Sequence, residues 1–197
     1  LALDFAYLEY LKGIQAKVDA MLPGRVNILD CGDCVRPPSV LVYSGSDRHP
    51  GEYLIYRPAT DQWQRLGPTR PEVDPRQMAG MAFHRIKARD GADLPLWVTM
   101  NTPADTKPRP AVVLAHGGPW ARGASWAWNA EAQFLASRGY VVIEPEFRGS
   151  TGYGDKHYRA GWKQWGQAMQ DDVTDALRFA VQRRWVDEKR VCIAGAS

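Results

Sequence analysis

Cysteine is scarce in this chain of 197 residues, which contains three: Cys31, Cys34 and Cys192. Cys31 and Cys34 form a C-x-x-C pair, but no second pair of cysteines or histidines supplies the roughly four ligands that a structural zinc site needs. The prolines at 37–38 exclude a thioredoxin-type site, because no helix can begin at the pair. We interpret the pair as an incidental feature of a loop, with a local disulfide as the next alternative. Cys192 lies in an apolar run and is predicted to be a core thiol.

Long apolar runs are absent as well. The sequence has no stretch of about 18 apolar residues, so no transmembrane helix and no membrane partner are expected. No basic segment followed by an apolar one precedes Leu1, so no targeting segment identifies the compartment, and the cytoplasm is favoured. Because the chain begins without methionine and stops after a strand-like run at Ser197, we expect it to be a fragment of a longer protein.

An excess of charge of one sign is also missing. Lysine and arginine number 25 and aspartate and glutamate 22, which gives a net charge of +3, and the basic residues are scattered. Nucleic-acid binding is therefore not expected. The hydrophobic share of 45% and the charged share of 24% are those of a globular protein. This composition excludes a collagenous, coiled-coil or wholly disordered chain.

The first part of the chain has the pattern of a helix followed by a β-meander. Apolar residues recur at steps of three and four over 3–22, which predicts an amphipathic helix that ends before the Pro-Gly pair at 23–24. Three short strands separated by turns are expected at 40–43, 53–56 and 63–66. Strands of this length and spacing fit part of a sandwich or of a β-propeller blade.

A proline-rich stretch at 67–80 is the candidate linker, and the pattern changes after it. Asp90-Gly91 predicts a hairpin turn between two strands at 83–88 and 94–100. Buried strands then alternate with amphipathic helices, which predicts an α/β unit with a parallel sheet and helices on both faces. The expected strands are at 111–115, 140–143 and 190–194, and the expected helices are at 131–137 and 167–185.

The last expected strand is followed by Gly195-Ala196-Ser197. Gly-x-Ser is the first half of the G-x-S-x-G nucleophile elbow, in which the serine sits on a sharp turn between a strand and a helix. The glycine two residues earlier provides the room that this turn requires. Gly-x-Ser alone recurs by chance, so it needs a second feature to carry a hypothesis.

His-Gly-Gly-Pro at 116–119 directly follows the strand expected at 111–115 and is that second feature. In α/β-hydrolases, the loop after this strand supplies one backbone N–H of the oxyanion hole, and the residue after the nucleophile supplies the other. The alternative is a plain Gly-Pro turn between a strand and a helix. We favour the oxyanion loop because Gly-x-Ser follows two strands later.

A glycine-rich loop at 147–154, Phe-Arg-Gly-Ser-Thr-Gly-Tyr-Gly, also follows a buried strand. It lacks the G-x-x-x-x-G-K-[ST] pattern, so phosphate binding is not expected. With His-Gly-Gly-Pro and Gly-x-Ser, it resembles the prolyl oligopeptidase family of serine peptidases, in particular the acylaminoacyl-peptidase and dipeptidyl-aminopeptidase branch. Trp165-Gly166 followed by Asp171-Asp172 also matches the segment that this family has between the glycine-rich loop and the nucleophile elbow.

The resemblance implies an α/β fold with two incomplete domains. Residues 1–75 would be the C-terminal part of a β-propeller domain. Residues 76–197 would be the first half of an α/β-hydrolase domain, truncated at the nucleophile. Ser197 falls on the position of the family's nucleophile, and Gly118 falls on the oxyanion-hole N–H donor.

Three further positions are carried over as candidate substrate-binding residues: His116, Gly117 and Arg148. His116 precedes the two glycines and would shape their loop without acting as the catalytic base. Arg148 falls on the family's arginine, for which a role in bracing the loop through ion pairs is favoured. Glu146 departs from the family, because relatives often carry asparagine there, and this leaves the details of the nearby pocket open.

The function that the resemblance implies is a serine-type peptidase, an exopeptidase or oligopeptidase that cleaves short peptides through an acyl-enzyme on Ser197. The alternatives are a carboxylesterase or lipase of the same fold, and a non-catalytic binding chain. The triad order of this fold is Ser, then Asp or Glu, then His, so both partners would follow Ser197 and the chain alone would be inactive. No cofactor and no metal are expected, and the oligomeric state is not predicted.

Overall fold

The computed structural model describes residues 2–32, 37–101 and 107–195, and Cys34 and Ser197 lie outside these ranges. The chain divides into two compact units, residues 1–77 and 78–197. The boundary expected from the sequence lies between residues 75 and 76. None of the described helices has the length and apolar character that a bilayer crossing requires.

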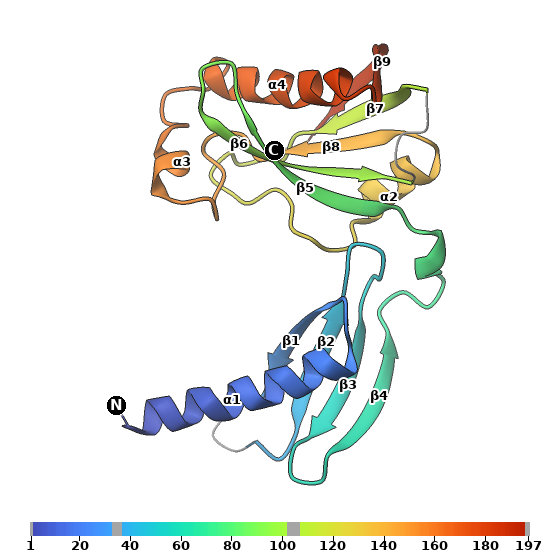
Figure 1. Ribbon diagram of the computed structural model, residues 1–197, viewed down its shortest axis with the longest axis vertical. Helices are drawn as coiled ribbons and strands as arrows, with labels where there is room; N and C mark the ends of the chain where they lie inside the picture. Colours follow the sequence, from blue (N-terminus) through green and yellow to red (C-terminus); the bar gives the residue numbers. More distant parts are fainter. Residues whose placement is uncertain (1, 33–36, 102–106, 196–197) are drawn as a thin grey trace. The chain divides into compact units, whose positions relative to one another are not determined.

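The first unit is one helix followed by a four-stranded antiparallel sheet in the order β1-β2-β3-β4 (Figure 1). The elements are α1 (Ala2–Met21), β1 (Val26–Asp30), β2 (Val40–Gly45), β3 (Glu52–Arg57) and β4 (Gln62–Pro68). Ile14 and Val18 of α1 are buried against Val40 and Val42 of β2, together with residues of β3. The predicted helix and the three predicted strands are therefore confirmed.

Two features of this unit differ from the sequence analysis. The strand β1 was not predicted, since its alternation is weak over five residues and Val26 and Ile28 are exposed. Cys31, which directly follows β1, is disulfide-bonded. The interpretation of the C-x-x-C pair as an incidental loop feature is therefore wrong for Cys31, because this cysteine is covalently cross-linked.

The second unit is built on a five-stranded sheet in the order β5-β6-β8-β7-β9. The predicted hairpin forms β5 and β6 and joins the sheet through antiparallel pairing of β6 with β8, whereas β8, β7 and β9 are parallel. The sheet is thus mixed rather than wholly parallel. Its strands are β5 (Gly80–Lys87), β6 (Asp93–Met100), β7 (Arg109–Leu114), β8 (Val141–Pro145) and β9 (Val186–Ala194).

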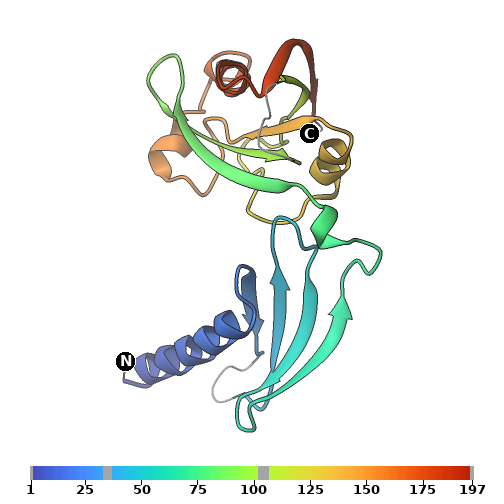
Figure 2. The same ribbon diagram turned by 45° about the vertical axis from the view of Figure 1, so that its right-hand side comes forward.

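Helices α2 (Ala130–Ser137) and α4 (Ala168–Gln182) cover opposite faces of this sheet (Figures 1 and 2). The alternation along β8 shows this, because successive strand side chains point to opposite faces. Val141 and Ile143 pack in the cluster that contains residues of α4, and Val142 packs in the cluster that contains residues of α2. The predicted α/β arrangement with helices on both faces is confirmed for this unit.

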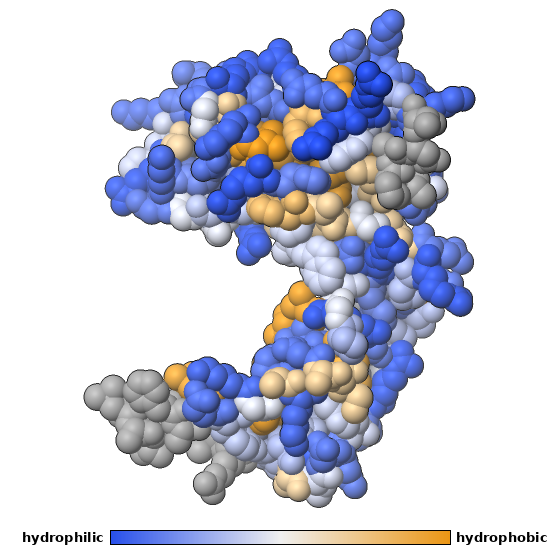
Figure 3. All heavy atoms as spheres, viewed as in Figure 1, coloured by the Kyte–Doolittle hydropathy of each residue, from blue (hydrophilic) through white to orange (hydrophobic). Residues whose placement is uncertain are grey.

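Two features of this unit differ from what the sequence predicts. A short helix, α3 (Asp155–Arg159), was not predicted, since its five residues are too few to show a helical period. Cys192, predicted to be a core thiol, is free and exposed. The reason is that β9 is the edge strand of the described sheet and pairs with β7 only. Ile193 beside it is also exposed, and Figure 3 shows orange, apolar residues at the surface near α4.

Candidate active site

The three motif segments meet at one edge of the second sheet. The strands β7, β8 and β9 are parallel, so their carboxyl ends lie together, and ligands of open α/β sheets bind at this edge. The 116–119 loop follows β7, the 146–154 loop follows β8, and Gly195 follows β9. The sequence motifs are therefore brought together by the order of the strands.

Gly195 lies against Ala115, the residue directly before the 116–119 loop. The Ala115 N–H donates to the carbonyl of Ala194 at 2.9 Å, which extends the β7–β9 pairing by one residue. A Cβ atom on Gly195 would lie 2.4 Å from the carbonyl oxygen of Ala115. Only glycine fits this approach, which agrees with the room that a nucleophile elbow needs. Ser197, two residues further on, lies outside the described residues.

Gly118 has a backbone conformation that other residues avoid. Its φ is +133°, and a Cβ atom would lie 2.9 Å from the amide nitrogen of Trp120. Among the described residues, no hydrogen-bond acceptor lies on the Gly118 N–H. A backbone N–H without a protein acceptor at this edge can donate to an oxyanion.

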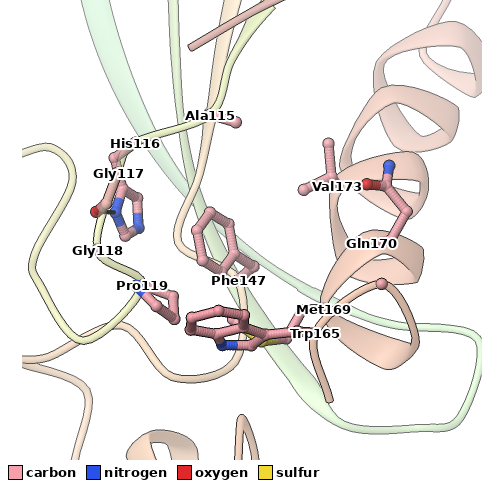
Figure 4. Close-up of a pocket in the computed structure, with 11 residues that line it drawn as sticks. Ala115, His116, Gly117, Gly118, Pro119, Phe147, Trp165, Met169, Gln170 and Val173 are labelled. Carbon is pink, nitrogen blue, oxygen red and sulfur yellow. Dashed lines mark hydrogen bonds between the residues drawn. The ribbon is translucent and has the colours of Figure 1, made fainter. Parts of the chain in front are cut away.

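The 116–119 loop also lines an apolar pocket of about 310 Å³ (Figure 4). Figure 4 shows Phe147 between this loop and helix α4, with Trp165 beside Pro119. Met169 and Val173 form the wall that α4 contributes. The apolar pocket therefore lies between the 116–119 loop and helix α4, with Phe147 as part of its lining.

His116 is held inside the loop rather than free for proton transfer. Its ring stacks on Phe147, with the centroids 4.3 Å apart and the planes 9° apart. Nδ1 lies 2.9 Å from the carbonyl oxygen of Gly117, and Nε2 lies 2.9 Å from Oγ of Ser150. These contacts connect the 116–119 loop to the 146–154 loop.

Arg148 is buried, and all three nitrogens of its guanidinium are engaged. Nε and Nη2 donate to the carboxylate of Asp172 at 2.8 and 2.7 Å, and Nη1 donates to Asp90 at 2.7 Å. The Arg148 backbone N–H also donates to Asp172, at 2.9 Å. The hydrogen bond from the Arg148 side chain lowers the pKa of Asp90 to about 2. The geometry favours the bracing role of Arg148 over direct substrate contact.

A second cavity of about 450 Å³ lies beside the same loop and contains buried carboxyl groups of β8 and the residue after it. Glu144 is 8% exposed, and its Oε2 has no hydrogen-bond partner among the described residues. Burial raises the pKa of Glu144 to about 7, and the charges of Glu146 and Glu131 act in the same direction. Glu144 therefore keeps its proton to a higher pH than an exposed carboxyl group does.

We expect Glu144→Gln to change how stability depends on pH. Because the folded pKa lies above the ordinary 4.5, the wild type loses stability as the pH rises from about 4.5 to about 7. The glutamine has no charge to bury, so this loss disappears. At pH above about 8 the variant should exceed the wild type by up to about 3 kcal/mol. Urea unfolding at several pH values measures this.

The matched control is Glu188→Gln, which removes a carboxylate from the exposed part of β9. It should leave the pH dependence of stability unchanged, because an exposed carboxylate pays no desolvation cost. An unchanged slope in Glu144→Gln would show that Glu144 is solvated in the folded protein.

Some residues of this site were not anticipated. The 58-residue separation between Arg148 and Asp90, and the role of Ser150 as the partner of His116, have no local pattern in the sequence. Gly123 is a third case: a Cβ atom there would lie 2.3 Å from the His116 ring. A glycine close after His-Gly-Gly-Pro was the only indication available. Within the described residues, no group of acidic, histidine or cysteine side chains could hold a metal ion.

Known proteins were found that are similar to this chain in sequence. Residues 126–197 match the family model of the prolyl oligopeptidase family. Dipeptidyl aminopeptidase BIII of Pseudoxanthomonas mexicana is 32% identical over 92% of this chain and 27% of its own length. Acylamino-acid-releasing enzyme 1 of Oryza sativa subsp. japonica is 28% identical over 72% of this chain and 20% of its own length.

Solved structures of peptidases are also similar to this chain in their fold. A puromycin-hydrolyzing peptidase of Mycobacterium tuberculosis is similar with a TM-score of 0.70 and 25% identity, over 82% of this chain and 26% of that one. An acylaminoacyl peptidase of Pyrococcus horikoshii shares the fold with a TM-score of 0.67 at 19% identity, over 86% of this chain and 26% of that one. The chain thus spans about a quarter of the length of the relatives that it matches.

Proposed function

The chain belongs to the prolyl oligopeptidase family, and we propose that the full-length protein that contains it is a serine peptidase acting on short peptides. In this proposal, the Ser197 hydroxyl attacks the scissile carbonyl carbon and gives its proton to a histidine base. The amine leaves with a proton from that base, and water then hydrolyses the acyl-enzyme. The base and its acidic partner would follow Ser197, as the triad order of this fold requires.

The observation that carries the proposal is the contact between Gly195 and Ala115, the residue directly before the 116–119 loop. It supports a geometry in which a serine two residues after Gly195 lies near the Gly118 N–H, which has no acceptor among the described residues. The developing negative charge on the carbonyl oxygen would accept a hydrogen bond from this N–H. The N–H of the residue after Ser197 would be the second donor. His116 and Gly117 would shape this loop, and Arg148 would brace the neighbouring one.

We propose that the two units have the finer identities that the family implies. The second unit would be the first half of an α/β-hydrolase domain. The first unit would be the last part of a β-propeller, whose blades are four-stranded antiparallel sheets such as β1-β2-β3-β4. Exposed apolar side chains of this unit support the proposal, since α1 packs on the face that holds Val40 and Val42, and a blade packs its remaining face against a neighbouring blade. They are Val26, Ile28, Tyr53 and Leu66.

A fluorophosphonate probe and two substrate classes test the reaction in the full-length protein. We expect the probe to label Ser197, and we expect peptide anilides to be hydrolysed along with simple aryl esters, because an acyl-enzyme forms from both. Turnover of esters without turnover of anilides would identify a carboxylesterase or lipase instead. An unlabelled Ser197 would show that the protein is a non-catalytic binding chain.

A further inference from the structure

A buried carboxyl group without a partner lies near the end of β8. Glu144 is two residues after Val142, so its side chain points to the face of the sheet that α2 covers. The residue is 8% exposed, and neither of its carboxyl oxygens accepts a hydrogen bond from the residues that the structure describes. Burial of such a group destabilises the fold. Its retention is explained where a ligand supplies the missing donor.

The side chain of Glu144 lines the cavity of about 450 Å³ beside the 116–119 loop. This cavity extends to Glu131 of α2, whereas the apolar pocket of Figure 4 lies between the same loop and α4. The two sides of the loop therefore differ in their chemistry. Gly195 also lines the cavity, two residues before Ser197. A group bound in the cavity thus lies close to a peptide bond held at the proposed nucleophile.

The acidic groups around this cavity outnumber the basic ones. Three carboxyl groups line it, those of Glu131, Glu144 and Glu146, and its described lining contains no lysine and no arginine. His116 is the other titratable residue of that lining, and both of its ring nitrogens already contact oxygen atoms of the two loops at 2.9 Å. The charges of Glu146 and Glu131 act together on Glu144. A field of this sign attracts a cation and repels an anion.

Glu144 is the carboxyl group that remains open to such a cation. The two oxygens of Glu146 accept hydrogen bonds from the backbone N–H groups of Gly123 and Ala124. Glu131 is exposed in the first turn of α2, where water and the positive end of the helix stabilise its charge. Glu144 has neither kind of compensation. A cation in the cavity therefore gains most by binding to Glu144.

The rest of the lining suits a long side chain with a charged end. Leu114, Ala124, Pro145 and Ala194 contribute apolar wall to the cavity. Lysine and arginine side chains pack their methylene groups on apolar surface and carry their charge at the tip. The terminal ammonium group of a peptide is attached directly to the backbone and has no such stem. A buried carboxyl group behind an apolar wall thus favours a lysine or arginine side chain.

We propose that this cavity binds the lysine or arginine side chain of a peptide substrate, next to the bond that is cleaved, and that Glu144 recognises the charge of this side chain. The positive tip donates to the carboxylate of Glu144, and the stem packs on the apolar wall. The bound cation offsets the burial of Glu144, because an opposite charge nearby favours the ionised form. Glu144 is thus a specificity-determining residue. The inference rests on the proposed function, since it takes a peptide as the substrate.

The first test measures kcat/KM of the full-length wild type for matched pairs of substrates. Norleucine has the stem of lysine without the ammonium group, and citrulline has the shape of arginine without the charge. Peptide anilides vary the residues on the acyl side of the bond, and short peptides vary the residue on the leaving side. At one of these positions, we expect lysine to exceed norleucine, or arginine to exceed citrulline, by at least about tenfold. Equal values within every pair would overturn the inference.

The second test repeats these pairs with Glu144→Gln in the full-length protein. The glutamine keeps the size of the side chain but carries no charge, so the ratio of kcat/KM between the charged and the neutral substrate should fall at least about tenfold. Glu188→Gln is the matched control, because it removes an exposed carboxylate of β9 that does not line the cavity, and it should keep the ratio of the wild type. A ratio that is unchanged in Glu144→Gln would overturn the inference.

A third pair of substrates separates the side chain from the terminal amino group as the occupant of the cavity. Peptide anilides with a free and with an acetylated amino group differ only at the N-terminus. A dependence on Glu144 that is confined to this pair would overturn the assignment to a lysine or arginine side chain. Failure of the proposed function has a different outcome, in which the wild type hydrolyses no anilide of any kind and Ser197 is not labelled by the fluorophosphonate probe.

Discussion

Replacement of Ser197 by alanine is expected to abolish peptide hydrolysis by the full-length protein, with a fall in kcat on the order of a million-fold. The size of the effect follows from the role of the hydroxyl. Without it no acyl-enzyme forms, and the histidine base has no nucleophile to activate, so the rest of the triad is lost as well. Rate measurements with a peptide anilide check this, together with loss of fluorophosphonate labelling.

Ser137→Ala is the control for this substitution. Ser137 is exposed on α2 and lies in none of the three loops of the site, and its hydroxyl donates to the carbonyl of Phe134. Its removal should change kcat by less than about twofold. Peptide affinity should survive in Ser197→Ala, because oxyanion donors and binding contacts remain. Substantial turnover by Ser197→Ala would place the nucleophile elsewhere.

The regular elements could be predicted because their signals are local. The helix α1 shows steps of three and four, and the buried strands β7 and β8 are apolar over most of their length. The strand β1 gave no such signal, because two of its apolar residues face outward. Burial of Cys192 was predicted wrongly from the same kind of local pattern. An apolar run shows that a residue is suited to a core, but strand order decides whether anything covers it.

The motifs of the candidate site were also visible, whereas the contacts that hold them were not. His-Gly-Gly-Pro and Gly-x-Ser are short and contiguous, so the sequence alone suggested that they work together. The partners of Arg148 are 24 and 58 residues away, and the acceptor of the His116 ring is 34 residues away. These pairings depend on which strand ends adjoin, and that information is not local.

The Arg148 network allows a second large effect to be predicted. Arg148→Met should destabilise the second unit by about 3 to 5 kcal/mol, because Asp172 would remain buried with an uncompensated charge. Asp172 is 2% exposed, so water cannot replace the lost donors. The urea unfolding transition measures this. Arg159→Ala is the control, because its pair with Asp155 is exposed on both sides and should contribute less than about 1 kcal/mol.

A second substitution distinguishes buried charge from lost packing as the cause. In the wild type, the backbone N–H of residue 148 donates to Asp172 at 2.9 Å. Asp172→Asn removes the charge but keeps a side-chain oxygen that can accept this hydrogen bond. Combined with Arg148→Met, it should therefore recover at least about half of the lost stability. If the double variant is as unstable as Arg148→Met, the arginine stabilises the loop by filling space. Recovery would show that this ion pair is retained because neither charge can be left alone in the interior.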